Sequence, residues 1–98
     1  MSMIYAILDF PVKPGHLDEA VRILRGALVA TRAFDGNLGA EILLDDDPRH
    51  FLLLETWESA AHNHAYQAWR MTPEGTTPGF AEHLTGPFTM TEYTVAPH

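Results

Sequence analysis

The stretch from Phe51 to Arg70 constrains the fold more than any other part of the chain. It begins as an unbroken apolar run, Phe51 to Leu54, becomes polar at Glu55 and continues into a helical pattern. A short apolar run of this kind is typical of a strand buried in a sheet. Both tryptophans of the sequence lie in this stretch. We therefore expect an aromatic, partly polar pocket where the strand meets the helix.

The other segments predict an alternation of strands and helices along a single domain, residues 1–98. Their apolar residues recur either at every second position, which predicts strands, or at every third and fourth position, which predicts helices. The predicted strands are 3–10, 37–44, 50–57 and 88–95, and the predicted helices are 15–34 and 58–71, followed by a loop at 72–79 and a helical turn at 80–84. The order β-α-β-β-α-β predicts an α+β, ferredoxin-like fold, in which a split β-α-β arrangement gives a four-stranded antiparallel sheet with helices on one face.

The predicted sheet has an apolar second face. Two helices cover one face of such a sheet, so the other face should alternate into polar residues. The strand at 50–57 is instead apolar on both sides from Phe51 to Leu54, and the strand at 37–44 adds Leu43. A second copy of the chain would cover this face, and we expect a homodimer packed sheet to sheet.

Composition excludes several classes of partner and site. The net charge is −7, with 13 acidic residues against 6 Lys and Arg, and no basic cluster exists that would suit nucleic acid or an anionic membrane. The sequence has no cysteine, which excludes disulfides and thiolate chemistry and fits a cytoplasmic protein. The N-terminal segment has no basic leader, and no apolar run approaches the roughly 20 residues needed to span a bilayer. The sequence predicts a soluble protein.

The helix at 58–71 is expected to border the pocket. A helical wheel centred on Ala65 places Asn63, Gln67 and Arg70 on the outer side. The predicted inward face consists of Ala61, His62, Ala65, Ala68 and Trp69. Its small alanines would leave a gap over the sheet, with Tyr66 on the flank and Trp57 entering from the strand end. Each aromatic residue and His62 could equally serve in packing alone.

No metal or nucleotide site is expected. His62 and His64 diverge by about 200° on a helix, and no third ligand is spaced to join them. The acidic run Asp45 to Asp47 lacks the central glycine and distal glutamate of a calcium loop, so it is expected to be a solvated turn. The sequence contains no glycine-rich phosphate loop and no dinucleotide fingerprint. We therefore expect no bound metal and no cofactor.

Three segments resemble the antibiotic biosynthesis monooxygenase family. They are DGNLGAE at 35–41, LETWES at 54–59 and AYQAWR at 65–70, in the family's order. The resemblance implies a dimeric α+β barrel. It also implies an activity, because some members oxidise phenolic or quinol aromatics with O₂ and without a cofactor, while relatives of the same fold degrade haem.

The resemblance and the wheel together suggest catalytic residues. Trp57 would form a wall of an aromatic slot, as in the family. His62 is the candidate base, because histidine titrates near neutral pH, and Tyr66 is the candidate hydrogen-bond donor.

Further residues are expected to bind substrate. Leu53 occupies the place of an asparagine in the polyketide-tailoring members. Trp69 borders the predicted gap, and His83 lies in the helical turn beside it. Haem-degrading relatives carry a histidine where this chain has Gln67, and an asparagine in the first strand that is missing here, so haem breakdown is not expected.

The sequence thus predicts a cofactor-independent, monooxygenase-like enzyme that oxidises a phenolic or quinol small molecule with O₂. Two alternatives stay open. One is a non-catalytic, dimeric module that binds a small molecule in the same cleft. The other is a non-oxidative cyclase or isomerase. The expected partners are a small aromatic molecule, O₂ and a second copy of the chain.

Overall fold

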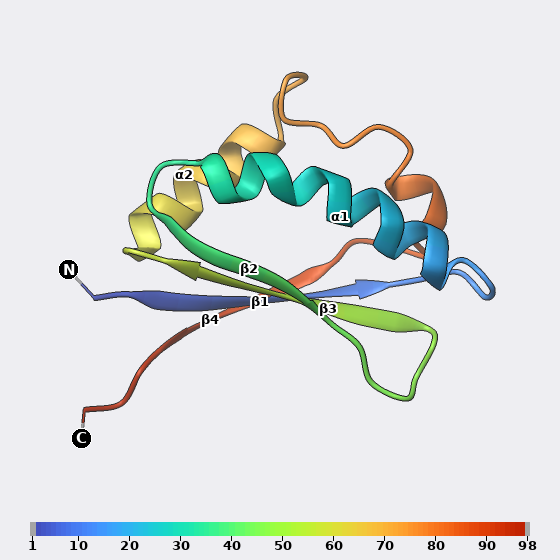
Figure 1. Ribbon diagram of the computed structural model, residues 1–98, viewed down its shortest axis with the longest axis horizontal. Helices are drawn as coiled ribbons and strands as arrows, with labels where there is room; N and C mark the ends of the chain where they lie inside the picture. Colours follow the sequence, from blue (N-terminus) through green and yellow to red (C-terminus); the bar gives the residue numbers. More distant parts are fainter. Residues whose placement is uncertain (1, 98) are drawn as a thin grey trace.

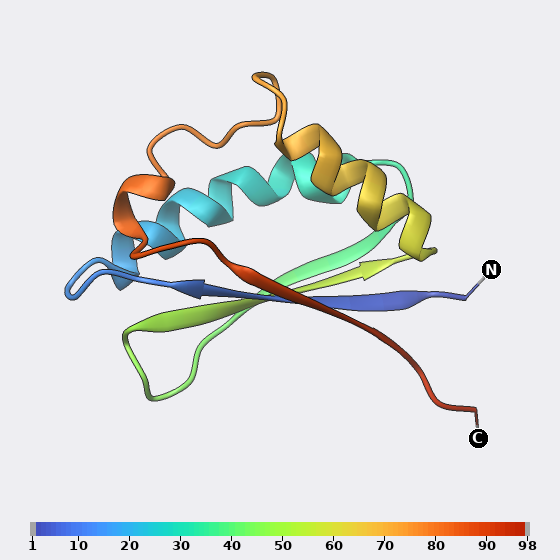
Figure 2. The same cartoon turned by 180° about the vertical axis from the view of Figure 1, so that it is seen from behind.

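Four antiparallel strands form a sheet in the order β2-β3-β1-β4 in the computed structural model, which describes residues 2–97. The strands are β1 (Ile4–Pro11), β2 (Asn37–Leu43), β3 (His50–Trp57) and β4 (Thr89–Thr94), and the helices are α1 (Leu17–Ala33), α2 (Ala60–Arg70) and the short 3-10 turn η1 (Ala81–His83). Both long helices cover the same face of the sheet (Figures 1 and 2). The predicted ferredoxin-like α+β fold is confirmed, and every element lies within two residues of its predicted bounds.

The core lies between the sheet and the helices. Side chains along a strand point alternately to the two faces of the sheet, and in β1 and β3 every second residue is buried. On the helix side these residues are Ile4, Ala6, Leu8 and Phe10 in β1 and Phe51, Leu53, Glu55 and Trp57 in β3. The stripe of α1 that packs against them consists of Ala20, Val21, Leu24, Leu28 and Thr31.

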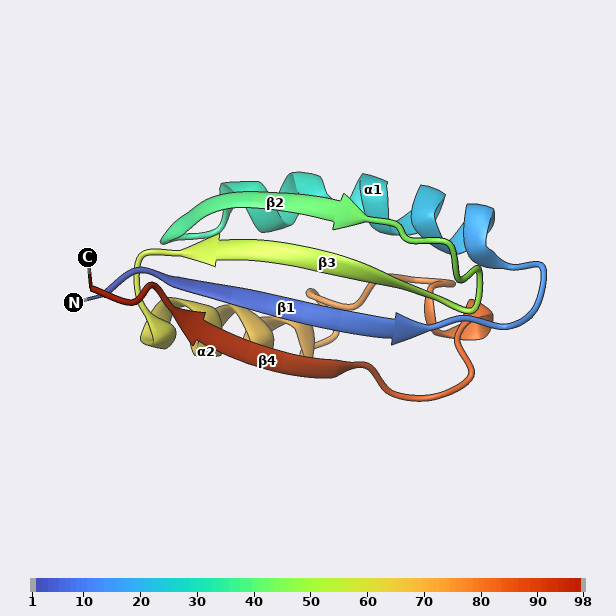
Figure 3. The ribbon, with the colours of Figure 1, turned by 90° about the horizontal axis from the view of Figure 1, so that it is seen from below.

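The opposite face of the sheet carries no helix, and we call it the open face (Figure 3). The residues that alternate with the core residues point to it. Its large apolar and aromatic residues are Tyr5, Ile7, Leu43, Leu52, Leu54 and Tyr93. The apolar second face predicted for the sheet is therefore present.

Local contacts at the N-terminus of α2 fix where this helix begins. The Ser59 hydroxyl accepts a hydrogen bond from the backbone N–H of His62 at 3.3 Å and so caps the helix. The His62 ring packs against Gly36, whose φ is 83° and where a Cβ would lie 2.2 Å from the ring. Only glycine combines that conformation with that close contact. From there α2 runs behind β1 and β4, while α1 runs behind β2 (Figure 3).

None of the helices in residues 2–97 combines the length and the apolar character that crossing a membrane requires.

Candidate active site

A cavity of about 600 Å³ lies between α2, the sheet and the chain that follows α2. This volume is in the range of small-molecule sites. One part of its wall is apolar and is formed by Leu8, Phe10, Leu24, Leu53, Phe80, Leu84, Pro87 and Phe88. The other part is polar and includes Glu55, Tyr66, Gln67, Arg70, Thr76 and Thr77. The cavity can therefore hold an aromatic body at one end and bind its polar groups at the other.

Glu55 is the titratable group with the most unusual environment in this wall. Its side chain is fully buried, because β3 points every second residue into the core. The Oε1 atom accepts a hydrogen bond from Trp57 Nε1 at 3.2 Å, whereas Oε2 is buried without a partner in residues 2–97. Burial raises the pKa of Glu55 to about 7, although the Trp57 hydrogen bond and the charge of Arg70 act in the opposite direction. A carboxyl group with such a pKa can accept and return a proton near neutral pH.

Tyr66 and Arg70 form a second polar group at the cavity. The Tyr66 hydroxyl lies 2.6 Å from Thr31 Oγ1 and accepts a hydrogen bond from Arg70 Nε at 2.6 Å. Burial raises the pKa of Tyr66, although both hydrogen bonds act to lower it. The guanidinium group also donates to the Ala27 carbonyl at 2.9 Å and to the Gly75 carbonyl at 3.2 Å. All of these acceptors are neutral, so the positive charge of Arg70 is available to stabilise an anion in the cavity.

The loop after α2 closes one side of the cavity. Gly75, Thr76 and Thr77 line it, and Arg70 holds this segment through the Gly75 carbonyl and Thr77 Oγ1. The segment also packs tightly on the end of α2, since a Cβ at Gly75 would lie 2.0 Å from the Trp69 carbonyl oxygen. The loop predicted at 72–79 therefore covers the site.

The residues expected from the sequence lie in the cavity wall, behind that wall, or away from the cavity. Leu53 and Tyr66 line the cavity. Trp57 and Trp69 pack behind the wall, with the Trp57 ring 4.9 Å and the Trp69 ring 6.1 Å from the Tyr66 ring, centroid to centroid. Trp57 reaches the site through its hydrogen bond to Glu55.

Neither predicted site histidine lines the cavity. His62 lies at the start of α2, where its Nδ1 is 2.7 Å from Ser59 Oγ and its ring contacts Gly36. His83 lies in η1, with its Nδ1 2.9 Å from His16 Nδ1. In this arrangement His62 supports the Ser59 cap and packs the start of the helix against Gly36, and His83 holds η1 against the segment before α1.

The helical-wheel prediction for α2 is wrong. Ala61, Ala65 and Ala68 are exposed, while Asn63 and Tyr66 are buried and Gln67 lines the cavity. The polar face turns inward because its groups find hydrogen-bond partners there: Asn63 Nδ2 donates to Glu92 Oε2 at 2.8 Å. A buried polar group that is hydrogen-bonded carries little penalty, and hydrophobic spacing alone does not detect that.

Glu55, Gln67 and Arg70 line the cavity but were not predicted from the sequence. A signal was present, because Glu55 continues the series Phe51, Leu53, Trp57 of residues that point to one face of β3. An acid at a core position of a buried strand indicates a perturbed carboxyl group. Gln67 and Arg70 were missed because the wheel placed them outside.

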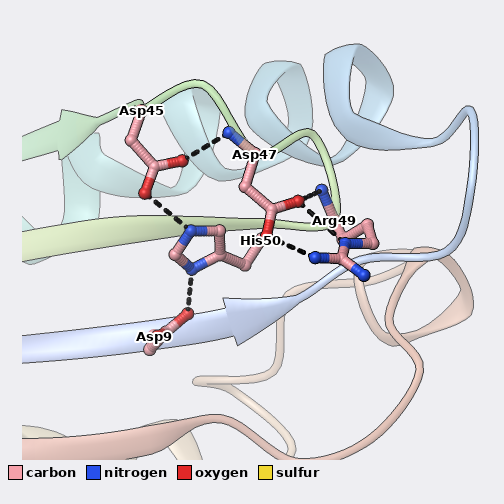
Figure 4. Close-up of polar contacts among 5 residues, drawn as sticks. All are labelled: Asp9, Asp45, Asp47, Arg49 and His50. Atoms are coloured by element: carbon pink, nitrogen blue, oxygen red, sulfur yellow. Dashed lines mark hydrogen bonds and ion pairs between the residues drawn. The ribbon is translucent and has the colours of Figure 1, made fainter.

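A second polar cluster lies at the turn between β2 and β3, away from the cavity (Figure 4). His50 Nδ1 lies 2.9 Å from Asp9 Oδ1, and His50 Nε2 lies 2.8 Å from Asp45 Oδ2. Asp47 pairs with Arg49, and hydrogen bonds from Arg49 lower the pKa of Asp47 to about 2. These contacts hold the turn. Within residues 2–97 no three His, Asp or Glu side chains converge as ligands for a metal ion.

The architecture recurs in solved structures. An antibiotic biosynthesis monooxygenase has 23% sequence identity and a TM-score of 0.75, with 96% of this chain and 99% of that chain covered. PA3566 from Pseudomonas aeruginosa has 20% identity and a TM-score of 0.77, over 99% and 97% of the two chains. Rv0793 from Mycobacterium tuberculosis has 23% identity and a TM-score of 0.73, over 99% and 96%. No curated protein matches the chain.

The sequence itself matches the model of one protein family. The match covers residues 3–77, which include β1, both long helices, the β2–β3 hairpin and most of the loop over the cavity. This is more than half of the chain, and the structural neighbours share its whole architecture. The chain therefore belongs to the antibiotic biosynthesis monooxygenase family.

Proposed function

We propose that the protein is a cofactor-independent monooxygenase that oxidises a phenolic or quinol aromatic small molecule with O₂, with Glu55 as the catalytic base. The observation that carries the proposal is the buried Glu55 carboxyl group, with a pKa of about 7, in the wall of a largely apolar cavity that includes Phe10, Phe80 and Phe88. The protein acts as a homodimer, and its lack of cysteine suits a reducing cytoplasm.

The reaction begins with proton transfer. The substrate hydroxyl donates its proton to Glu55, and the resulting phenolate is electron-rich enough to give one electron to O₂. The charge of Arg70 and the hydroxyl of Tyr66 stabilise the anion at the polar end of the cavity. The phenoxyl radical and superoxide then combine at the ring carbon para to the hydroxyl, which forms a carbon–oxygen bond.

The remaining steps balance without an added reductant. The peroxide takes the proton from Glu55, the O–O bond breaks as the ring carbon loses its hydrogen, and water leaves. For a phenol with a free para position the overall reaction is phenol plus O₂ to quinone plus water. The apolar wall, which includes Leu53 and Phe10, keeps bulk water from the intermediates.

Turnover of 1-naphthol tests the proposal. Anaerobic protein is mixed with 1-naphthol, O₂ is admitted, and O₂ consumption and quinone absorbance are recorded. We expect Glu55→Gln to lower kcat by roughly 100-fold or more, the usual contribution of a general base. His62→Ala should retain activity, since His62 lies outside the cavity. Unchanged turnover in Glu55→Gln, or none in the parent protein, would refute the assignment.

Catalase distinguishes two oxidative outcomes. A monooxygenase releases water, so added catalase leaves the O₂ consumption unchanged. An oxidase releases hydrogen peroxide, and catalase would then return half of the O₂. The latter result would contradict the proposed oxygen insertion.

A further inference from the structure

Two side-chain amides on α2 link a carboxylate on β4 to the carboxyl group of Glu55. Glu92 Oε2 accepts from Asn63 Nδ2 at 2.8 Å, and Asn63 Oδ1 accepts from Gln67 Nε2 at 3.1 Å. Gln67 Nε2 also lies 3.5 Å from Glu55 Oε1. Asn63 and Gln67 are four residues apart, so they share one face of the helix.

Glu92 determines which atom donates and which accepts in the hydrogen bonds that run from Glu92 through Asn63 to Gln67. An ionised carboxylate can only accept hydrogen bonds, and Glu92 is held ionised: burial acts to raise its pKa, but hydrogen bonds to Asn63 and His64 outweigh burial and lower it. Asn63 must therefore turn its NH₂ group toward Glu92 and its oxygen toward Gln67. Gln67 in turn must direct its NH₂ group at Asn63.

The Gln67 carbonyl oxygen is left unused by this arrangement. Both hydrogen bonds that the structure gives to the Gln67 side chain use Nε2, while the residue lines the cavity. Its Oε1 is thus left to accept a hydrogen bond from a ligand, on a side chain whose Nε2 contacts Glu55, and Glu55 Oε2 also has no partner in the described part of the chain. The site offers two neighbouring acceptors to a ligand.

We propose that Glu92 is a positioning residue that turns the Gln67 carbonyl toward the cavity, so that the site selects aromatic substrates with two hydroxyl groups on one edge over those with one. One hydroxyl group binds Glu55 and the other binds Gln67 Oε1. The inference rests on the proposed function and deepens it, because it assigns the substrate class. A ligand with one hydroxyl group leaves the second acceptor unpaired.

Replacing Glu92 by glutamine removes the acceptor-only group that fixes the orientation of the Asn63 and Gln67 amides. A glutamine side chain can donate as well as accept, so in Glu92→Gln both amides can reverse and Gln67 can present its NH₂ group to the cavity. The second acceptor is then lost, while the size of each side chain is kept. Gln67→Leu removes the same acceptor directly. Glu19→Gln, in an exposed pair with Arg22 on α1, is the matched control.

The test compares two probes under anaerobic conditions, so that binding is measured without turnover. Dissociation constants of 1,8-dihydroxynaphthalene and 1-naphthol are measured by calorimetry for each variant. We expect the dihydroxy probe to bind roughly tenfold more tightly to the parent protein and to Glu19→Gln, the effect of one additional hydrogen bond. The ratio should fall to about one in Glu92→Gln and in Gln67→Leu.

Each remaining outcome is decisive. Equal affinity for the two probes in the parent protein, or an unchanged ratio in Glu92→Gln, would overturn this inference and leave the proposed function intact. A uniform loss of affinity for both probes in Glu92→Gln would show a merely structural role and would also overturn it. Failure of both probes to bind the parent protein would overturn the proposed function as well.

Discussion

At the scale of single residues, Glu55 makes the stability of the fold depend on pH. Its pKa is about 7 in the folded state against 4.5 for an ordinary glutamate. Between these values the folded state binds more protons than the unfolded state, so stability is full below about pH 4.5 and is lost as the pH rises through 7. The difference corresponds to roughly 3 kcal/mol.

We expect Glu55→Gln to remove this dependence. The amide keeps an acceptor for Trp57 Nε1 but cannot ionise. Chemical denaturation at pH 5 and pH 8 should therefore show the variant to be more stable than the parent protein at pH 8, by up to about 3 kcal/mol. The Glu19→Gln control should follow the parent protein. A variant that loses as much stability as the parent protein over this interval would contradict the buried, proton-binding state of Glu55.

Residues of the site differed in how far the sequence could predict them. Glu55 and Leu53 follow from alternation in β3, because the side-chain period of a strand is fixed. Gln67 could not be placed in the same way. The rotation of α2 depends on partners far along the chain, such as Thr31 for Tyr66 and Glu92 for Asn63. Hydrophobic periodicity contains no information on such pairings.

At the scale of elements, strands and helices were predicted well because each has a strong local signal. The apolar run of β3 and the stripe of α1 fix these two elements, and Pro48 marks the turn between β2 and β3. The loop after α2 was also predicted, but no local signal gives its position in the fold. Its position over the cavity comes from contacts with Arg70 that only the folded structure creates.

Arg70 is expected to hold this loop in place. Arg70→Met keeps the length of the side chain but removes the hydrogen bonds to the Gly75 carbonyl and Thr77 Oγ1, each worth about 1.5 to 3 kcal/mol because the donor is charged. Hydrogen exchange followed by mass spectrometry should show amide exchange in residues 72–77 at least tenfold faster. Arg22→Met, on the exposed side of α1, should leave this segment unchanged. Equal exchange in the two variants would mean that other contacts hold the loop.

At the scale of the whole molecule, we expect the open face of the sheet to pack against a second copy of the chain. Leu43 and Tyr93 are 39% and 52% exposed, and they lie on the same surface as Ile7, Leu52 and Leu54. A group of large apolar side chains on one exposed face indicates an interaction surface. A second copy would bury it by packing sheet on sheet.

We expect light scattering to give the mass of a dimer for the parent protein. Leu54→Glu places a charge on the open face and should yield a monomer, because an unpaired charge is costly to bury. Val29→Glu introduces the same change at a position on α1 that is 71% exposed and should remain dimeric. A monomeric parent protein, or a dimeric Leu54→Glu variant, would exclude this mode of association.

The cavity and the open face lie on opposite sides of one sheet. In a dimer joined through the open faces, two sheets about 10 Å apart would separate the two cavities, and each cavity would face outward. A ligand that enters one copy then touches no residue at the contact between the copies. Titration of the dimer should therefore give two equivalent, independent sites with a Hill coefficient of about one.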